Sequence, residues 1–151
     1  MSCLDELSFN NIKEEKEIFE LLLYFNSSFE PSLTERGIDL ELYSKKLSMN
    51  SICIGAYCNG KCVAFSSFYA NDFENLTSYL TLIVVDEGYR NKRIGQLLLD
   101  KFIEVSIERK MKKAKLEVRK NNLIAINLYK KKGFEFLKES SNGFIYMNKN
   151  L

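Results

Sequence analysis

The sequence predicts an α/β (α+β) domain in which helices flank a mixed, mostly antiparallel sheet. Residues 80–85 form a short apolar run rich in β-branched side chains, which is typical of a buried strand. The period becomes helical from Ile94, and a further strand at 114–118 completes a β-α-β unit. Two other strand-like runs, 51–58 and 61–69, are joined by an Asn-Gly pair, a strong hairpin signal because both residues tolerate positive φ.

The residues before this hairpin predict a short strand and two helices. A strand is expected within residues 1–10, carried by Leu4, Leu7 and Phe9. Residues 14–25 follow a helical period with acidic side chains in the first turn. Pro31 ends that helix, and a second helix is expected over residues 39–47.

The residues after the central strand predict two more helices and a final hairpin. The helix that starts near Ile94 carries an apolar stripe, widened by Leu99, Ile103 and Ile107, and ends in the basic segment 109–113. Cations at a helix C-terminus complement its dipole, so this segment has a structural explanation. Residues 122–132 predict a helix that stops at Gly133, and residues 134–138 and 144–148 predict the hairpin.

Length and composition suit a single domain over residues 1–151. With 46% hydrophobic residues and one Pro, the chain is expected to be globular. Its 22 Lys and Arg nearly balance 20 Asp and Glu, which weighs against a nucleic-acid partner. No apolar run is long enough to cross a bilayer, and the N-terminus lacks signal-peptide features. A cytoplasmic protein without a membrane partner is therefore expected.

The chain has four Cys and no His. The Cys spacing lacks a paired CxxC motif, so reduced thiols are expected and no metal site is predicted. Without His there is no Ser-His or Cys-His relay, and acid–base chemistry must use Glu, Asp, Tyr, Cys, Lys or water.

The first candidate site is the basic loop that follows the central strand, at residues 86–95, which ends in Gly95. The first amides of a helix have no partner inside the helix, and the helix dipole is positive there, so a phosphate fits such a loop. The alternative is an ordinary turn whose Arg and Lys are simply solvated.

The second candidate site lies around the strand at 114–118 and the helix after it. Glu117 and Arg119 share one face of the strand, so Glu117 serves either as an ion-pair partner or as a carboxylate poised for proton abstraction. Asn122, Ala125 and Tyr129 share one helix face. Asn122 can cap the helix or donate to a ligand, and Tyr129 can pack or act chemically.

These stretches resemble two signatures of the GNAT superfamily of N-acetyltransferases. Residues 85–95 resemble its acyl-CoA-binding pattern, Gln/Arg-x-x-Gly-x-Gly/Ala, with Arg90 first and Gly95 last, although Arg93 stands where the middle Gly is usual. The spacing of Asn122, Ala125 and Tyr129 before Gly-Phe resembles the second signature. Leu-Glu-Val-Arg at 116–119 looks like that of ribosomal-protein N-terminal acetyltransferases.

The resemblance implies a GNAT-like fold with a β-α-β acyl-CoA-binding core and direct acetyl transfer from acetyl-CoA to a primary amine, without a metal. It implies that Tyr129 protonates the departing thiolate and that Glu117 acts, through water, as the general base. The residues expected to bind the co-substrate are Ile83, Val84, Val85, Arg90, Asn91, Lys92, Arg93, Ile94, Gly95, Gln96, Asn122, Ala125 and Tyr129.

Other functions remain open at this point. One is a non-catalytic acyl-CoA-binding module. Another is a protein that binds nucleic acid or an acidic partner through the basic segments 109–115 and 130–132. Within the enzyme class, the acceptor could be a peptide N-terminus or a small-molecule amine such as a polyamine, an amino sugar or an antibiotic. The resemblance also allows a homodimer.

Overall fold

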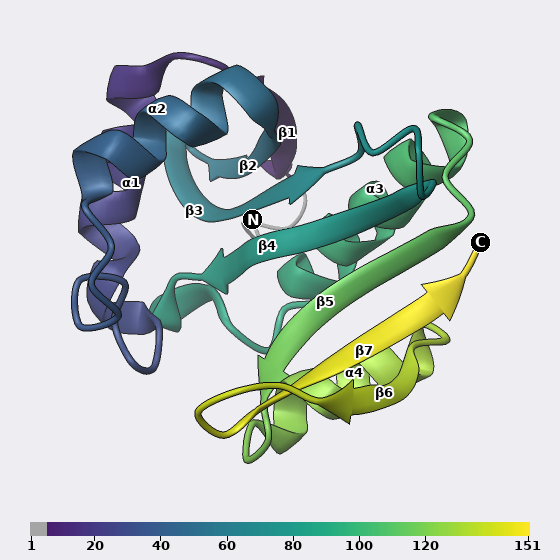
Figure 1. Cartoon of the computed structure of the whole chain (residues 1–151). Helices are drawn as coiled ribbons and strands as arrows, with labels where there is room; N and C mark the ends of the chain where they lie inside the picture. Colours follow the sequence, from purple (N-terminus) through teal and green to yellow (C-terminus); the bar gives the residue numbers. More distant parts are fainter. Residues whose placement is uncertain (1–5) are drawn as a thin grey trace. The chain divides into compact units, whose positions relative to one another are not determined.

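A computed structural model describes residues 6–151 (Figure 1). The strands are β1 Ser8–Ile12, β2 Ile52–Cys58, β3 Lys61–Tyr69, β4 Thr77–Val85, β5 Lys113–Arg119, β6 Glu135–Glu139 and β7 Phe144–Asn150. The helices are α1 Glu15–Phe25, α2 Leu40–Asn50, α3 Ile94–Glu108 and α4 Leu123–Lys131. Two short 3₁₀ turns lie at Asn26–Ser28 and Glu87–Tyr89.

The strands form one seven-stranded sheet in the order β1-β2-β3-β4-β5-β7-β6. β1 pairs antiparallel with β2, and β7 pairs antiparallel with both β5 and β6. β4 and β5 pair in parallel, as expected for two strands joined by the crossover helix α3. The predicted fold class, a mixed and mostly antiparallel sheet flanked by helices, is confirmed.

The chain divides into two compact units, and β4 and α3 each contribute to both. The first unit contains the residues up to Ser67 together with Leu82–Leu99, and the second contains Phe68–Thr81 and Asp100–Leu151. The loop between β4 and α3 therefore belongs to the first unit, whereas α4 and the final hairpin belong to the second.

The core of the first unit is built by the apolar face of α1 against the hairpin strands. Ile18, Leu22 and Phe25 are buried, which is the stripe predicted from the helical period. The Phe25 ring lies 5.6 Å from the ring of Phe65 on β3. α1 and α2 lie side by side (Figure 1), and Asp39 caps α2 by accepting from two backbone amides of its first turn.

The core of the second unit includes buried side chains from α3, α4, β5 and β7. The Phe68 and Phe102 rings lie 5.0 Å apart. Ser106 donates to the Ser78 hydroxyl over 2.7 Å, so this buried polar pair is satisfied. β5, β7 and β6 run side by side (Figure 1), and β6 at the edge is exposed along its whole length.

The structure differs from the sequence-based expectations in a few places. β4 begins at Thr77, earlier than the apolar run at 80–85. Ile107 was expected to widen the buried stripe of α3, but its side chain is 55% exposed and the neighbouring Ser106 is buried, because Ser106 meets Ser78. Leu4 lies outside the described residues.

The cysteines also differ in part from the expectation of reduced thiols. Cys53 and Cys62 are free, but Cys58 is disulfide-bonded. Burial raises the pKa of the Cys62 thiol to about 11, so this group stays protonated near neutral pH. Among the described residues, no helix is long and apolar enough to cross a membrane.

Candidate functional site

The predicted site residues fall into two groups, one in each unit. The β4–α3 loop and the end of β4 lie in the first unit. Glu117 on β5 and the three predicted residues of the α4 region lie in the second.

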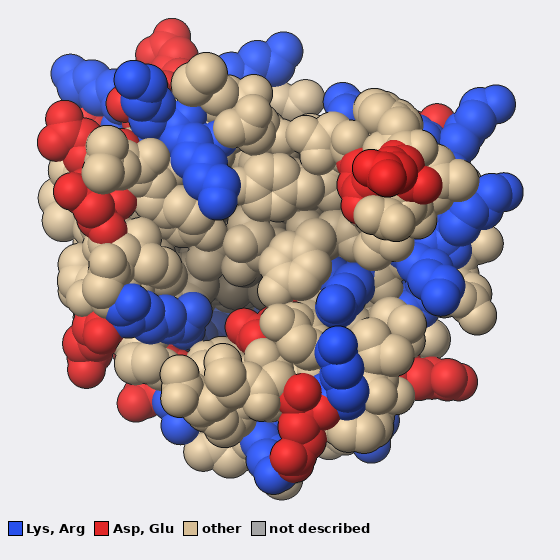
Figure 2. Space-filling model, in the orientation of Figure 1, with Lys and Arg blue, Asp and Glu red and all other residues tan. Residues whose placement is uncertain are grey.

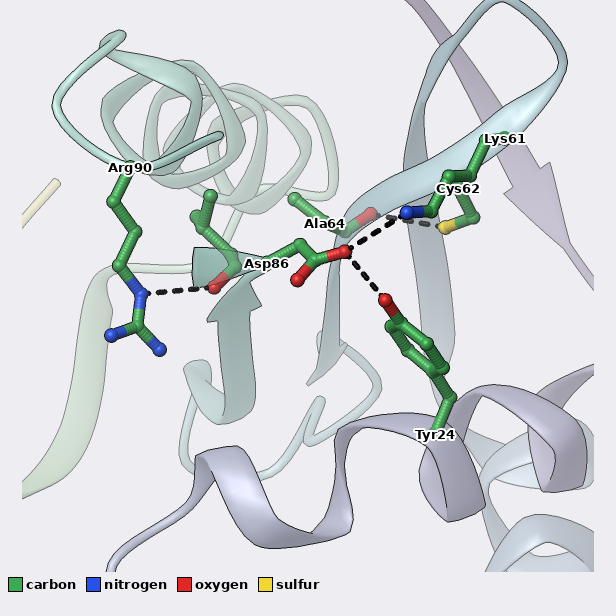
Figure 3. Close-up of polar contacts among 7 residues, drawn as sticks. Tyr24, Lys61, Cys62, Ala64, Asp86 and Arg90 are labelled. Carbon is green, nitrogen blue, oxygen red and sulfur yellow. Dashed lines mark hydrogen bonds and ion pairs between the residues drawn. The ribbon is translucent and has the colours of Figure 1, made fainter. Parts of the chain in front are cut away.

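The loop starts from a firmly held residue, Asp86, which directly follows β4. Its backbone N–H donates to the Val63 carbonyl over 2.8 Å. Its carboxylate accepts a 2.7 Å hydrogen bond from the Tyr24 hydroxyl and lies 3.3 Å from Lys61 Nζ (Figure 3). Three segments that are distant in the sequence, α1, β3 and β4, therefore meet at this one carboxylate.

The charge states of this cluster are stabilised by the contacts themselves. The hydrogen bond from Tyr24, and then the nearby Lys61 ammonium, hold the pKa of the Asp86 carboxyl below its usual value. The bond to Asp86 raises the pKa of both Tyr24 and Lys61. Each group therefore keeps its charge state from about pH 5 to pH 9. These contacts are lost in acid when Asp86 is protonated, below the ordinary carboxyl range, and in alkali when Lys61 and Tyr24 lose their protons, above their ordinary ranges.

The next residues of the loop fold back onto the end of β4. The Tyr89 N–H donates to the Asp86 carbonyl over 2.8 Å, which closes the 3₁₀ turn. The Arg90 side chain donates from Nε to the Val85 carbonyl over 3.1 Å (Figure 3). Lys61 Nζ lies 5.7 Å from the Tyr24 ring centre and 5.6 Å from that of Tyr89, within cation–π range. The chain is thus fixed on both sides of the turn before it reaches α3.

The middle of the loop adopts a backbone conformation that glycine usually supplies. Asn91 has φ 63° and Arg93 has φ 65°, both in the left-handed region. Arg93 stands where the family pattern has Gly, and its backbone takes the conformation that Gly would take. A left-handed residue followed by a helical one, here Arg93 and Ile94, directs successive N–H groups to one side as an anion-binding nest.

Gly95 leaves the start of α3 open. A Cβ at this position would meet only Val85 Cγ2, at 3.6 Å, which is ordinary contact, and the φ of Gly95 is not left-handed. The fold therefore does not require Gly here, although a helical Gly costs roughly 0.5–1 kcal/mol relative to Ala. The preceding Ile94 is buried and fixes the helix end. A bare backbone at a helix N-terminus, flanked by Lys92 and Arg93, fits a phosphate group.

The end of β4 supplies further backbone groups beside the loop. Val84 is buried, whereas Ile83 and Val85 occupy the half-exposed face of the strand. The parallel register with β5 covers only Thr77–Leu80 of β4, so these three residues lie outside it.

In the second unit, Asn122 caps α4. Its Oδ1 accepts from the Ala125 N–H over 3.2 Å, so the cap predicted from the sequence is present. The side-chain Nδ2 of Asn122 can still donate to a ligand. Ala125 is half-buried and adds little bulk to this face of the helix.

Tyr129 lies two turns into the same helix and is buried. Its ring packs 6.1 Å from that of Phe134, and the side chain is 5% exposed. Burial raises the pKa of its phenol to about 12, so the hydroxyl is protonated near neutral pH. The hydroxyl makes no hydrogen bond within residues 6–151. A neutral phenol of this kind is available to donate its proton.

Glu117 lies on the exposed face of β5. Its carboxylate accepts a short hydrogen bond from the Ser140 hydroxyl, which lies in the β6–β7 connection. In the described part of the chain Glu117 forms no ion pair, so the alternative in which it serves as an ion-pair partner is not observed there. The carboxyl group of Glu117 is oriented by a neutral donor, the Ser140 hydroxyl.

Four residues that support these sites were not identified from the sequence: Tyr24, Lys61, Asp86 and Ser140. Asp86 lay within the loop that was singled out, but Tyr24 is 62 positions away from it along the chain. Exposed Tyr, Lys and Ser have no periodicity that assigns them a partner, so no sequence signal could have found these contacts.

Several known proteins are similar to this chain in sequence. The acetyltransferase (GNAT) family matches residues 17–134. N-alpha-acetyltransferase 30 of Dictyostelium discoideum is 35% identical over 88 residues, which cover 58% of this chain and 48% of that protein. Spermine/spermidine N(1)-acetyltransferase of Bacillus subtilis is 33% identical over 89 residues, covering 55% of this chain and 59% of that protein. The chain thus spans about half the length of these relatives.

A solved structure shows the same fold. The PaiA N-acetyltransferase of Thermoplasma acidophilum, solved in complex with coenzyme A, superposes with a TM-score of 0.73 at 18% identity. The match covers 95% of this chain and 99% of that one. The family match extends over most of the sequence and includes both groups of predicted site residues. The chain belongs to the acetyltransferase (GNAT) family.

Proposed function

We propose that this chain is an N-acetyltransferase that moves an acetyl group from acetyl-CoA directly to a primary amine. The observation that carries the proposal is the β4–α3 loop, in which an anchored turn, left-handed Asn91 and Arg93 and the open Gly95 fit a phosphate-bearing ligand. Family membership and the two relatives named as N-acetyltransferases support the same reaction.

The loop would bind the pyrophosphate of acetyl-CoA. The backbone N–H groups of Asn91, Ile94, Gly95 and Gln96 supply donors, and Arg90, Lys92 and Arg93 supply positive charge. The backbone of Ile83, Val84 and Val85 would hold the pantetheine arm, and an N–H there would polarise the thioester carbonyl. Asn122 Nδ2 would donate a hydrogen bond to the pantetheine arm, and the small side chain of Ala125 would leave room for that arm along the helix.

Two side chains would move the protons of the transfer. The amine is protonated in water at neutral pH and must lose a proton before it can attack, so Glu117 takes that proton through water. The amine nitrogen then bonds to the carbonyl carbon and the carbon–sulfur bond breaks. The nitrogen gives up its second proton to solvent, which leaves a neutral amide. Tyr129 donates its hydroxyl proton to the departing thiolate, and its raised pKa keeps that proton in place until this step. Solvent later returns a proton to Tyr129.

Replacing Tyr129 by Phe tests the acid. Because the hydroxyl makes no hydrogen bond within the described residues, Tyr129→Phe should leave the thermal midpoint nearly unchanged while lowering kcat about a hundredfold. Calorimetric titration should give an acetyl-CoA Kd close to that of the native chain. An unchanged kcat would remove the acid assignment. Binding without turnover in the native chain would instead favour a non-catalytic acyl-CoA-binding module.

Gly95 offers a matched pair of substitutions at the loop. Gly95→Glu places a carboxylate where a pyrophosphate is proposed to lie, so the acetyl-CoA Kd should rise at least tenfold. Gly95→Ala adds only a Cβ in ordinary contact with Val85 and should change Kd by no more than a few-fold. Equal binding by both variants would show that the ligand lies elsewhere.

A pH profile tests Glu117. In Glu117→Gln the acidic limb of kcat/KM should disappear, because the amide cannot take a proton, while acetyl-CoA binding is retained. A profile identical to that of the native chain would assign the base to another group or to water.

The anchor itself can be tested through the affinity for acetyl-CoA. Asp86→Asn removes the charge that holds Lys61 and weakens the bond from Tyr24, so the acetyl-CoA KM should rise several-fold while kcat at saturation stays close to native. Tyr24→Phe and Lys61→Met each remove one contact and should give smaller increases. If KM stays constant in all three variants, the cluster does not position the loop.

A further inference from the structure

The face of the sheet that carries Glu117 has an uneven distribution of charge. Glu117 on β5 is the register partner of Tyr146 on β7, and Tyr146 is in turn the partner of Lys138 on β6. Directly paired residues point to the same face, so these three side chains form one row across three strands.

The neighbouring rows on this face add further cations. Residues two positions apart on a strand share a face, so Lys113, Lys115 and Arg119 lie on the same side of β5 as Glu117. Glu135 reaches this face through its pairing with Asn148, the partner of Lys115.

This face of β5, β6 and β7 therefore carries more positive than negative side chains. The four cations are Lys113, Lys115, Arg119 and Lys138, and the two carboxylates are Glu117 and Glu135. Over β5 and β7, Figure 2 shows Lys and Arg side chains interleaved with fewer Asp and Glu.

Two of these cations are held close to Glu117 without being neutralised by it. Lys115 Nζ lies 4.3 Å from the centre of the Tyr146 ring, and Lys138 Nζ lies 5.9 Å from the same centre. Both distances are within cation–π range. In the described part of the chain neither lysine forms an ion pair, and Glu117 takes its hydrogen bond from Ser140 instead. The aromatic ring thus positions two free ammonium groups beside the proposed base.

These contacts point to the chemical class of the acceptor. We infer that the acceptor is an amine with carboxylates close to it, such as a peptide whose N-terminal residue is followed by acidic residues, and that Lys115 and Lys138 select it. This inference rests on the proposed function, because it takes Glu117 as the group that receives the amine proton. An anionic segment is attracted to the two ammonium groups, whereas a polyamine would bring several positive charges to a face that is already positive.

The test compares acceptors that differ only in charge. Peptides with an N-terminal alanine followed by two glutamates, two glutamines or two lysines are assayed beside spermidine, with acetyl-CoA saturating. At low ionic strength, kcat/KM should be about tenfold higher for the glutamate peptide than for the lysine peptide, with spermidine lowest. At about 0.5 M salt the ratio should fall by several-fold, since these exposed charges are screened.

A pair of double variants with equal change in net charge identifies the residues responsible. Lys115→Met with Lys138→Met should bring the glutamate-to-lysine ratio close to one. Lys130→Met with Lys131→Met removes two exposed cations from the last turn of α4 and should preserve the ratio. Equal loss in both double variants would indicate a general effect of net charge and would overturn the assignment to this face.

The failure of the inference and the failure of the proposed function give different results. Turnover that favours spermidine or the lysine peptide, or that ignores peptide charge, overturns the acceptor assignment and leaves acetyl transfer intact. An absence of thiol release with every acceptor overturns the proposed function and the acceptor assignment together.

Discussion

The β4–α3 loop depends on the contacts that the Asp86 carboxylate makes. Asp86 is the first residue after β4. Through Tyr24 and Lys61 it joins a helix and a hairpin strand to the start of the basic loop. An exposed ion pair alone contributes little, because water screens the charges and the side chains lose freedom. Here the ion pair shares its carboxylate with a phenol hydroxyl, and the backbone of Asp86 is separately bonded to Val63. The combination fixes where the loop begins, so the residues that follow have few remaining conformations.

This fixed start explains how the loop can hold an unfavourable backbone. A left-handed non-glycine residue costs roughly 1–2 kcal/mol, and both Asn91 and Arg93 adopt that region. Asn tolerates it better than Arg does. The same conformation turns backbone donors toward one side. At Gly95 the local preference is also not followed, but in the opposite sense. The fold has room for a side chain there, and a side chain would stabilise the helix. Both departures from local preference occur within a few residues, where an anionic ligand is proposed to bind.

The two proposed proton carriers differ in environment in the way that their roles require. Tyr129 is buried without a polar partner in the described residues, so its proton is held more tightly than in water. Glu117 is exposed, unpaired and oriented by Ser140. Tyr129 thus retains its proton at neutral pH, whereas Glu117 is open to solvent. Neighbouring cations on Tyr146 complete the surroundings of Glu117 without forming an ion pair with it.

The fold class, nearly all of the helices and strands and the family are predictable from the sequence alone, because these depend on local periodicity, on turn residues such as Asn59-Gly60 and on short motifs at fixed spacing. The sequence also indicated a cap at Asn122, which the structure contains, and the loop that stays a proposed site. The partners that support those residues are visible only in the folded structure. The contacts of Tyr24 and Lys61 with Asp86, of Ser140 with Glu117, and of Lys115 and Lys138 with Tyr146 join positions on different elements. Polar side chains on exposed faces carry no periodic signal, so their partners emerge only when the strands and helices have been brought together.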